Sequence, residues 1–246
     1  MKSLLLNSLI LACTITNIAA AQTRPVLVAG ATGQTGKLVV QALLAENLPV
    51  RAMTRNPEKA AAFSGGVEGV VGDATDPASL AAAMQGVGIV ISTIGARFPI
   101  GDNGFAAVDW EGNRALIDAA KAAGVERFVL LSAGSAGRDG FPYSWSISPY
   151  PWKAKSEQYL RDSGMSYAIL AAGGLRDYAA GEQAIKLAPR SEYEGALISR
   201  ADLANVLVVC ATEAACLGKT ITIVNQEGVA PTGTWRASLA GLPKDP

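Results

Sequence analysis

Hydrophobic residues along this chain alternate between short apolar runs and longer segments with helical spacing. This rhythm is typical of βαβ units and a parallel sheet. The short runs predict strands at Val26–Ala29, Val50–Met53, Gly69–Val71, Ile89–Thr93, Phe128–Leu131, Tyr167–Leu170 and Thr220–Val224. The longer segments predict helices at Thr35–Glu46, Pro77–Gln85, Phe105–Ala123, Trp152–Asp162 and Ala201–Glu213. We therefore predict an α/β fold with a doubly wound, mostly parallel sheet in a single domain.

Glycine and loop composition mark where these elements end. Gly124 and Gly164 follow predicted helices, at the position where a left-handed C-terminal cap favours glycine. The segments 133–151 and 173–199 lack regular spacing, and long loops of this kind in α/β domains usually lie over the strand ends, where ligands bind. The tail from Gly228 to Pro246 has no clear period.

The N-terminus differs from the rest of the chain. Lys2 precedes an apolar stretch that ends in Ala19-Ala20-Ala21, the pattern of a secretory signal peptide over residues 1–21. An uncleaved apolar helix and lipoprotein processing at Cys13 are the alternatives. No later stretch reaches the roughly 20 apolar residues that span a bilayer. We expect residues 22–246 to be exported to the periplasm or secreted, with organelle targeting or a cytoplasmic location left open.

Composition excludes several classes of function. Lys plus Arg number 21 and Asp plus Glu number 21, with no charge run, so nucleic acid and acidic membranes are not predicted partners. Histidine is absent, which removes Ser-His-Asp triads and histidine metal sites, and we predict no metal. Cys210 and Cys216 could pair, but Cys210 lies in an apolar helical run, which favours two free thiols.

The segment between the first strand and the first helix is rich in glycine. Gly30 permits a tight turn, Gly33 leaves the backbone bare for a pyrophosphate, and Gly36 lets helix and strand pack closely. This spacing between a strand and a helix predicts a Rossmann-type dinucleotide site. We expect the turn residues to contact the cofactor: Gly30, Thr32, Gly33, Gln34, Thr35 and Gly36.

The residue after the second strand indicates which dinucleotide is bound. An acidic residue there would hold the ribose of NAD, whereas arginine suits the 2′-phosphate of NADP. Arg55 stands at this position, so NADP(H) is the predicted cofactor. Arg51 is expected to point to the other side, and Lys59 to assist as a mobile charge.

Residues after the third and fourth strands are also expected to line the cofactor. Asp73 is placed to accept a hydrogen bond from an adenine amino group, whereas Asp76, before Pro77, is typical of an N-cap. The further predicted contacts from these loops are Ala74, Thr93 and Gly95.

Several motifs in order resemble the atypical short-chain dehydrogenase/reductase family, in its NAD(P)-binding, NmrA-like branch that includes flavin and biliverdin reductases. They are the glycine turn with residues 72–76, 109–113, 125–132 and 198–204, and the likeness covers about residues 24–227. The resemblance implies NADP(H) at the strand ends, with either reductase chemistry or redox sensing without turnover. It implies that Ser132 lies near nicotinamide and substrate, and that Lys153 reaches the nicotinamide ribose.

The sequence departs from this family at the proton donor. Catalytic relatives place a tyrosine four residues before the lysine, so that the ammonium lowers the pKa of the phenol. That position is Pro149 here, and Tyr150 is expected at or before the helix cap because Pro151 suits the first turn. The family's Arg-Pro before its double glycine is replaced by Ala171-Ala172.

We predict an NADP(H)-dependent oxidoreductase that transfers hydride to a small acceptor, namely a flavin, quinone or carbonyl compound. Ser132 would bind the acceptor, Lys153 would orient the ribose and Tyr150 would be a proton donor. The alternatives are a non-catalytic NADP(H)-binding redox sensor or protein-docking module, and an epimerase or dehydratase acting on a nucleotide sugar.

Overall fold

One mixed sheet organises the chain, and the computed structural model describes residues 24–137 and 148–246 of it. Its strands lie in the order β3 (Val67–Val71), β2 (Val50–Thr54), β1 (Val26–Ala29), β4 (Ile89–Ser92), β5 (Arg127–Ala133), β6 (Ser166–Ala172), β10 (Lys219–Gln226) and β8 (Ala184–Pro189). Every neighbouring pair is parallel except β10 and β8, which run antiparallel. The carboxyl ends of seven strands therefore meet at one edge of the sheet.

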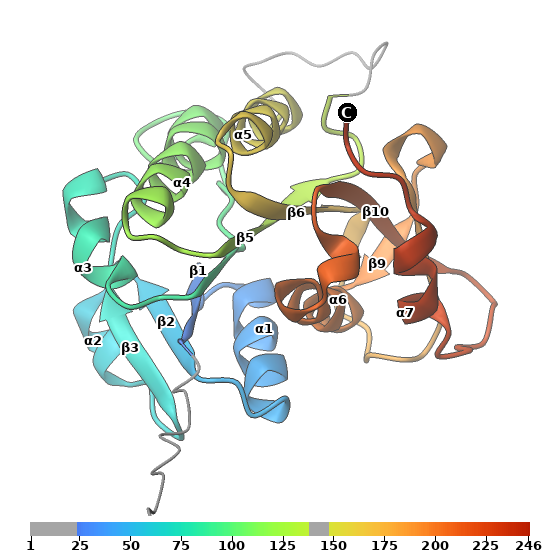
Figure 1. Ribbon diagram of the computed structural model, residues 1–246, viewed down its shortest axis with the longest axis horizontal. Coiled ribbons are helices and arrows are strands. Elements are labelled where there is room, and N and C mark those ends of the chain that lie inside the picture. Colours follow the sequence, from blue (N-terminus) through green and yellow to red (C-terminus); the bar gives the residue numbers. More distant parts are fainter. Residues whose placement is uncertain (1–23, 138–147) are drawn as a thin grey trace, which may run out of the picture.

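Helices cover both faces of this sheet (Figure 1). On one face lie α1 (Gln34–Ala45) and α6 (Arg200–Thr212), and on the other lie α3 (Leu80–Met84), α4 (Asn113–Ala122) and α5 (Tyr150–Asp162). In β1, Val26 and Val28 pack into the core on the α1 and α6 side, whereas Leu27 and Ala29 pack into the core on the other side. A strand buried on both faces explains the continuous apolar runs in the sequence. The predicted doubly wound Rossmann fold in a single domain is confirmed.

Two predicted helices are each divided in the structure. The segment expected over 105–123 begins as a π-helical turn, η2 (Ala106–Gly112), which continues directly into α4. The segment expected over 77–85 begins as the 3-10 turn η1 (Pro77–Ser79), which Asp76 caps through its side chain, followed by α3. The short helix α2 (Pro57–Ala61), capped by Asn56, was not expected.

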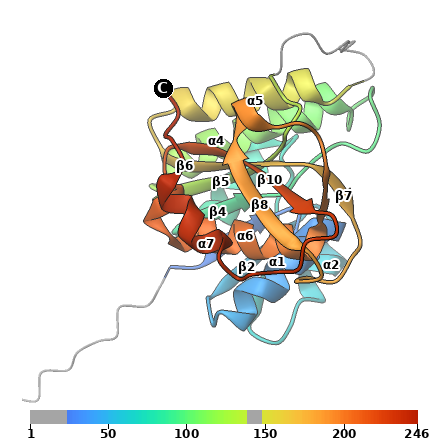
Figure 2. The same ribbon diagram turned by 90° about the vertical axis from the view of Figure 1, so that its right-hand side faces the viewer.

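The region 173–199, expected to be irregular, contains three strands. In addition to β8, the short strands β7 (Gly174–Arg176) and β9 (Leu197–Ser199) form a separate parallel pair. Figure 2 looks onto β8 at the edge of the main sheet, with α7 (Trp235–Ser238) from the tail beside it. The 3-10 turns η3 (Arg190–Glu192), η4 (Ala214–Cys216) and η5 (Leu239–Gly241) complete this half of the chain.

The expectation of two free thiols is wrong, because Cys210 and Cys216 form a disulfide with Cα atoms 5.3 Å apart. Helix α6 ends at Thr212, and η4 turns the chain back so that Cys216 returns to the side of Cys210. Arg127, the first residue of β5, donates to the carbonyl oxygens of Cys210 and Ala211. The disulfide therefore lies at the amino edge of the sheet.

The predicted helix caps are confirmed, since Gly124 and Gly164 have φ of 67° and 76° and follow α4 and α5. Within the described ranges, no helix has the length and apolar character that crossing a bilayer requires. The predicted leader over residues 1–21, with Cys13, lies outside the described residues, as does much of the loop expected over 133–151.

Candidate cofactor site

The glycine turn leaves β1 and enters α1 at the carboxyl edge of the sheet. Gly30 has φ of 82°, a left-handed conformation that favours glycine, and its carbonyl accepts a hydrogen bond from the Gly33 N–H at 2.9 Å. A Cβ added at Gly36 would lie 2.1 Å from the Gly30 oxygen, so helix and strand can pack this closely only with glycine at position 36. The roles predicted for Gly30 and Gly36 therefore have a direct structural cause.

The start of α1 is a bare cradle of backbone N–H groups. Gly33 is the N-cap residue, is exposed, and contributes no side-chain cap. The N–H groups of the first turn, from Gln34 to Gly36, have no carbonyl of a preceding turn to bind, and the helix dipole adds positive potential there. Such a cradle fits the pyrophosphate of a dinucleotide. Thr32, within the turn, is half-buried, whereas the Thr35 side chain is buried.

The two arginines of the second strand have different surroundings. Arg51 points away from the carboxyl edge, pairs with Glu68 at 2.8 Å and donates to the Ala83 carbonyl. Arg55 follows the end of β2, is exposed, and donates from Nη1 to the side-chain oxygen of Asn103. Arg55 therefore stands exposed at the carboxyl edge of the sheet. Asn103 was not singled out from the sequence.

The turn after β3 is held by its own side chains. One carboxylate oxygen of Asp73 accepts from the backbone N–H and the hydroxyl of Thr75 at 2.9 and 2.8 Å. Ala74 is buried, and a Cβ added at Gly112 of η2 would lie 3.2 Å from the Ala74 side chain. Asp73 is thus fixed at the carboxyl edge, and Ala74 packs under η2.

The segment after β4 carries the other two predicted contacts. Thr93 uses both its N–H and its hydroxyl to bind the Ala29 carbonyl, at 3.0 and 2.8 Å, which ties β4 to β1. Gly95 is exposed, and a Cβ added to it would lie 3.5 Å from Asp109 Oδ1 and 3.7 Å from Lys153 Nζ. Gly95 therefore forms open backbone directly beside a charged pair.

Lys153 reaches this point from the first turns of α5. Its Nζ lies 2.7 Å from Oδ1 of Asp109, whose side chain is only 1% exposed, while the Lys153 side chain is 17% exposed. The other carboxylate oxygen accepts the Ala96 N–H at 3.0 Å. The contact is an ion pair rather than an aligned hydrogen bond, because Asp109 Oδ1 has no hydrogen-bond partner among the described residues. An ammonium group has three N–H donors, which suit the hydroxyl groups of a ligand placed beside Gly95.

Asp109 was not assigned a role from the sequence, although it stands in a motif of the resemblance. It lies on the π-helical turn, a feature often found at functional sites. Its carbonyl accepts from Asn113 and Ser156, and Asn113 in turn accepts from Ser92 at 2.7 Å. The available signal was its place in the motif 109–113, because four other charged residues share the predicted helix 105–123.

Ser132 lies at the end of β5 in a different buried network. Its hydroxyl donates to Oε1 of Glu157, a carboxylate that is 1% exposed. Arg190 pairs with both Glu157 oxygens at 2.7 and 2.8 Å, and Arg161 lies 3.1 Å from Oε2. Arg190 also donates to the carbonyl oxygens of Ala133 and Ala136. The network therefore holds the loop that follows β5.

Tyr150 is the first residue of α5, with Pro149 as the cap, rather than lying at or before the cap as expected. Its backbone N–H donates to the Ser148 hydroxyl at 3.3 Å. Tyr150 and Lys153 therefore share one helix, and the Lys153 N–H binds the Pro149 carbonyl at 2.9 Å.

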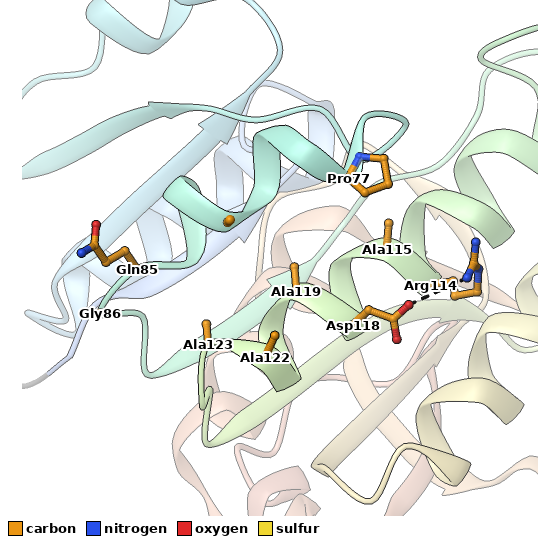
Figure 3. Close-up of a pocket in the computed structure, with 10 residues that line it drawn as sticks. Pro77, Gln85, Gly86, Arg114, Ala115, Asp118, Ala119, Ala122 and Ala123 are labelled. Atoms are coloured by element: carbon orange, nitrogen blue, oxygen red, sulfur yellow. Dashed lines mark ion pairs between the residues drawn. The ribbon is translucent and has the colours of Figure 1, made fainter.

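Two cavities lie on the α3 and α4 side of the sheet. The larger, about 700 Å³, runs between these helices along alanine side chains, with the Arg114 and Asp118 pair at its rim (Figure 3). The smaller, about 480 Å³, shares Arg114 and reaches Ala74 and Asp102. Neither is lined by the glycine turn or by Lys153, so we place the candidate site at the carboxyl edge of the sheet instead.

Comparison with known proteins gives consistent results. A family model described as NAD(P)H-binding matches residues 30–214. Sanguinarine reductase from Eschscholzia californica is 32% identical over 224 residues, covering 74% of this chain and 82% of that protein. An uncharacterized chloroplastic protein of Arabidopsis thaliana is 34% identical, covering 79% of this chain and 68% of its own length.

Two further similarities bear on the range of functions. The photosystem II assembly factor Ycf39 of Cyanophora paradoxa is 34% identical, covering 66% of this chain and 49% of that protein. Among solved structures, ChuY, an anaerobillin reductase from Escherichia coli O157:H7, superposes with a TM-score of 0.67 at 28% identity. That match covers 82% of this chain and 98% of ChuY.

Proposed function

Since this chain belongs to the NAD(P)H-binding family, we propose that it is an NADP(H)-dependent oxidoreductase that transfers hydride to a small acceptor. The observation that carries the proposal is the Lys153 ammonium, held 2.7 Å from buried Asp109 beside the open backbone of Gly95. This pair lies at the same edge of the sheet as the glycine turn. When bound, the cofactor would supply the hydride.

The chain's own residues would bind and orient the cofactor. The bare N–H groups from Gln34 to Gly36 would receive the pyrophosphate. Arg55, exposed at the end of β2, would grip the 2′-phosphate and so favour NADP(H) over NAD(H). Lys153 would donate to the ribose hydroxyl groups beside Gly95.

We propose a flavin or quinone as the acceptor in preference to a simple carbonyl compound. Hydride transfer to such a ring needs little acid catalysis, and Pro149 stands where catalytic relatives place the tyrosine. The names of sanguinarine reductase and of ChuY, an anaerobillin reductase, support a reductase function. Ser132, whose proton is directed at Glu157, could contact an acceptor only by accepting a hydrogen bond.

The test is NADPH oxidation with FMN, menadione and an aromatic aldehyde, measured for the wild type, Lys153→Met and Lys155→Met. Lys155 lies on the same helix, 4.8 Å from the Trp110 ring, and provides a matched control. We expect Lys153→Met to lose about tenfold or more in kcat/KM and Lys155→Met to match the wild type. Failure of the wild type to bind either dinucleotide would contradict the proposal.

A second candidate is a non-catalytic NADP(H)-binding module that docks on a partner. The absence of tyrosine at position 149 favours it, and Ycf39 is named as an assembly factor. NADPH binding without turnover of any of the three acceptors would select this function over the first.

We propose that residues 1–21 target the chain to an organelle rather than to the exterior. Several relatives are named as chloroplastic, which supports this location. Expression of the full chain fused to a fluorescent protein, followed by cell fractionation, tests this location.

A further inference from the structure

A side-chain contact joins the loops that follow the two strands flanking β1. In the sheet, β2 and β4 both pair with β1. Arg55 directly follows β2, and Asn103 belongs to residues 94–105 between β4 and η2, a segment called the strap below. Nη1 of Arg55 donates to Oδ1 of Asn103. The contact therefore lies at the edge where the glycine turn leaves β1.

The strap is fixed at its base and folded on itself. At its base, the Ala96 N–H donates to Asp109 at 3.0 Å. Near its end, the Gly104 N–H donates to the Gly101 carbonyl at 2.8 Å, and the Phe105 N–H to the Pro99 carbonyl at 3.2 Å. Asn103 lies within this turn, so its amide is presented to Arg55 from an ordered backbone.

The chemistry of Asn103 orients the guanidinium without neutralising it. An amide oxygen carries no net charge, and none of the ion pairs found in residues 24–137 and 148–246 includes Arg55. Arg51, in contrast, is neutralised by Glu68. A guanidinium has five N–H donors in a planar fork, so one contact to Asn103 leaves donors for a phosphate.

We propose that Asn103 is a positioning residue for dinucleotide selectivity, which holds Arg55 in place for the 2′-phosphate of NADP(H). This inference rests on the proposed function. Fixing a long side chain before binding reduces the entropy lost when the phosphate arrives. The strap would thus favour NADPH without touching the phosphate.

The experiment is a fluorescence titration of the full chain with NADPH and NADH. We expect Asn103→Ala to weaken NADPH binding about fivefold and to leave NADH binding within about twofold. Asn103→Asp should weaken NADPH binding further, because a carboxylate would pair with Arg55 and repel the phosphate. Asp102→Ala, the neighbouring strap residue, is the matched control and should keep the wild-type preference. Thermal denaturation checks that all variants fold.

A double-mutant cycle separates positioning from general loop damage. In an Arg55→Ala background, Asn103→Ala should have no further effect on NADPH binding. Equal weakening of NADPH and NADH by Asn103→Ala, or an unchanged preference in that variant, would overturn the inference alone. A wild type that binds both dinucleotides equally would overturn the NADP(H) assignment and the inference with it.

Discussion

Lys153 and Asp109 form an ion pair that joins α5 to the π-helical turn η2, with Nζ 2.7 Å from Oδ1. The same carboxylate binds the Ala96 N–H at the base of the strap. One buried carboxylate therefore sets the position of the lysine and of the segment that follows β4. The candidate site depends on Asp109 although Asp109 itself is almost inaccessible to solvent.

Asp109→Asn tests this dependence. The amide keeps the shape but removes the charge opposite Lys153, so we expect NADPH affinity to fall about tenfold and the free energy of unfolding to fall by about 1–3 kcal/mol. We expect a smaller loss than for a fully buried ion pair, because Lys153 is partly exposed and solvent screens its charge. Urea denaturation and NADPH titration measure the two effects.

Asp118→Asn is the control for that experiment. Asp118 lies on α4, binds the Tyr159 hydroxyl at 2.6 Å and is half exposed. Its replacement should leave NADPH affinity unchanged. Equal NADPH affinity in Asp109→Asn and the wild type would show that the pair only stabilises the fold.

Two alanine substitutions in the glycine turn should separate binding from folding. A Cβ at Gly36 would lie 2.1 Å from a backbone oxygen, so Gly36→Ala should lower the free energy of unfolding by about 2–4 kcal/mol. A Cβ at Gly33 would lie 3.1 Å from the same oxygen, at an exposed position with φ of −75°. Gly33→Ala requires the Gly30 carbonyl to shift by only a few tenths of an ångström, so it should lose much less stability than Gly36→Ala and bind NADPH at least about tenfold more weakly. Circular dichroism melting and NADPH titration distinguish the two outcomes, and normal binding by Gly33→Ala would place the pyrophosphate elsewhere.

The parallel strands could be predicted because a strand that is buried on both faces consists of a continuous run of apolar residues. Strand β8 was missed because it is an edge strand with exposed Lys186, and its antiparallel pairing with β10 is determined by tertiary contacts. The disulfide was missed for a related reason. The helical run around Cys210 gives no indication that the chain turns back after Thr212.

In the candidate site, too, some residues could be predicted from the local sequence and others depend on tertiary contacts. The glycine turn and Arg55 could be assigned roles from the local sequence, because each directly follows a predicted strand. Asp109 and Asn103 acquire roles only through Lys153 and Arg55, which are distant in sequence. The engagement of Ser132 with Glu157 likewise depends on how α5 packs on β5.

The disulfide should stabilise the fold without affecting the cofactor site. In the chain-entropy account, a loop of this size contributes about 2 kcal/mol, since the cysteines are 6 residues apart in sequence. Cys210→Ala with Cys216→Ala should therefore lower the melting temperature and leave NADPH affinity within about twofold of the wild type, because the disulfide is at the opposite edge of the sheet. Maleimide labelling after denaturation should modify these two thiols only when a reductant has been added. Labelling of Cys210 or Cys216 without reductant, separated from labelling of Cys13 by peptide mapping, would contradict the disulfide.

Stability should fall at high pH partly through Tyr167. Burial, with a hydrogen bond to Asp245, raises the pKa of Tyr167 to about 12 from its ordinary value of 10.0. The folded state thus holds the phenol proton more tightly than the unfolded chain. This contribution to the free energy of unfolding is complete below about pH 10 and is lost as the pH rises to about 12.

Tyr167→Phe removes this titration. The stability difference between the wild type and Tyr167→Phe should therefore shrink between about pH 10 and pH 12, as measured by urea denaturation at each pH. Tyr178→Phe, which removes a phenol on a 41% exposed side chain, is the control. A difference independent of pH would mean that Tyr167 contributes only its packing and its hydrogen bond.

The final prediction concerns Ser132 and Glu157. Glu157 is buried between Arg190 and Arg161, so Glu157→Gln leaves Arg190 without its carboxylate partner, while Arg161 keeps Asp245 at 3.2 Å, and should cost about 3 kcal/mol in the free energy of unfolding. Ser132→Ala removes only one hydrogen bond to that carboxylate, so its stability loss should be about 1 kcal/mol. Because the Ser132 proton is directed at Glu157, Ser132→Ala should lower kcat/KM for NADPH oxidation by less than about tenfold. Steady-state kinetics with the acceptor that the wild type reduces fastest measures this change in kcat/KM. A loss of about a hundredfold or more in kcat with unchanged stability would instead assign Ser132 a direct role at the acceptor.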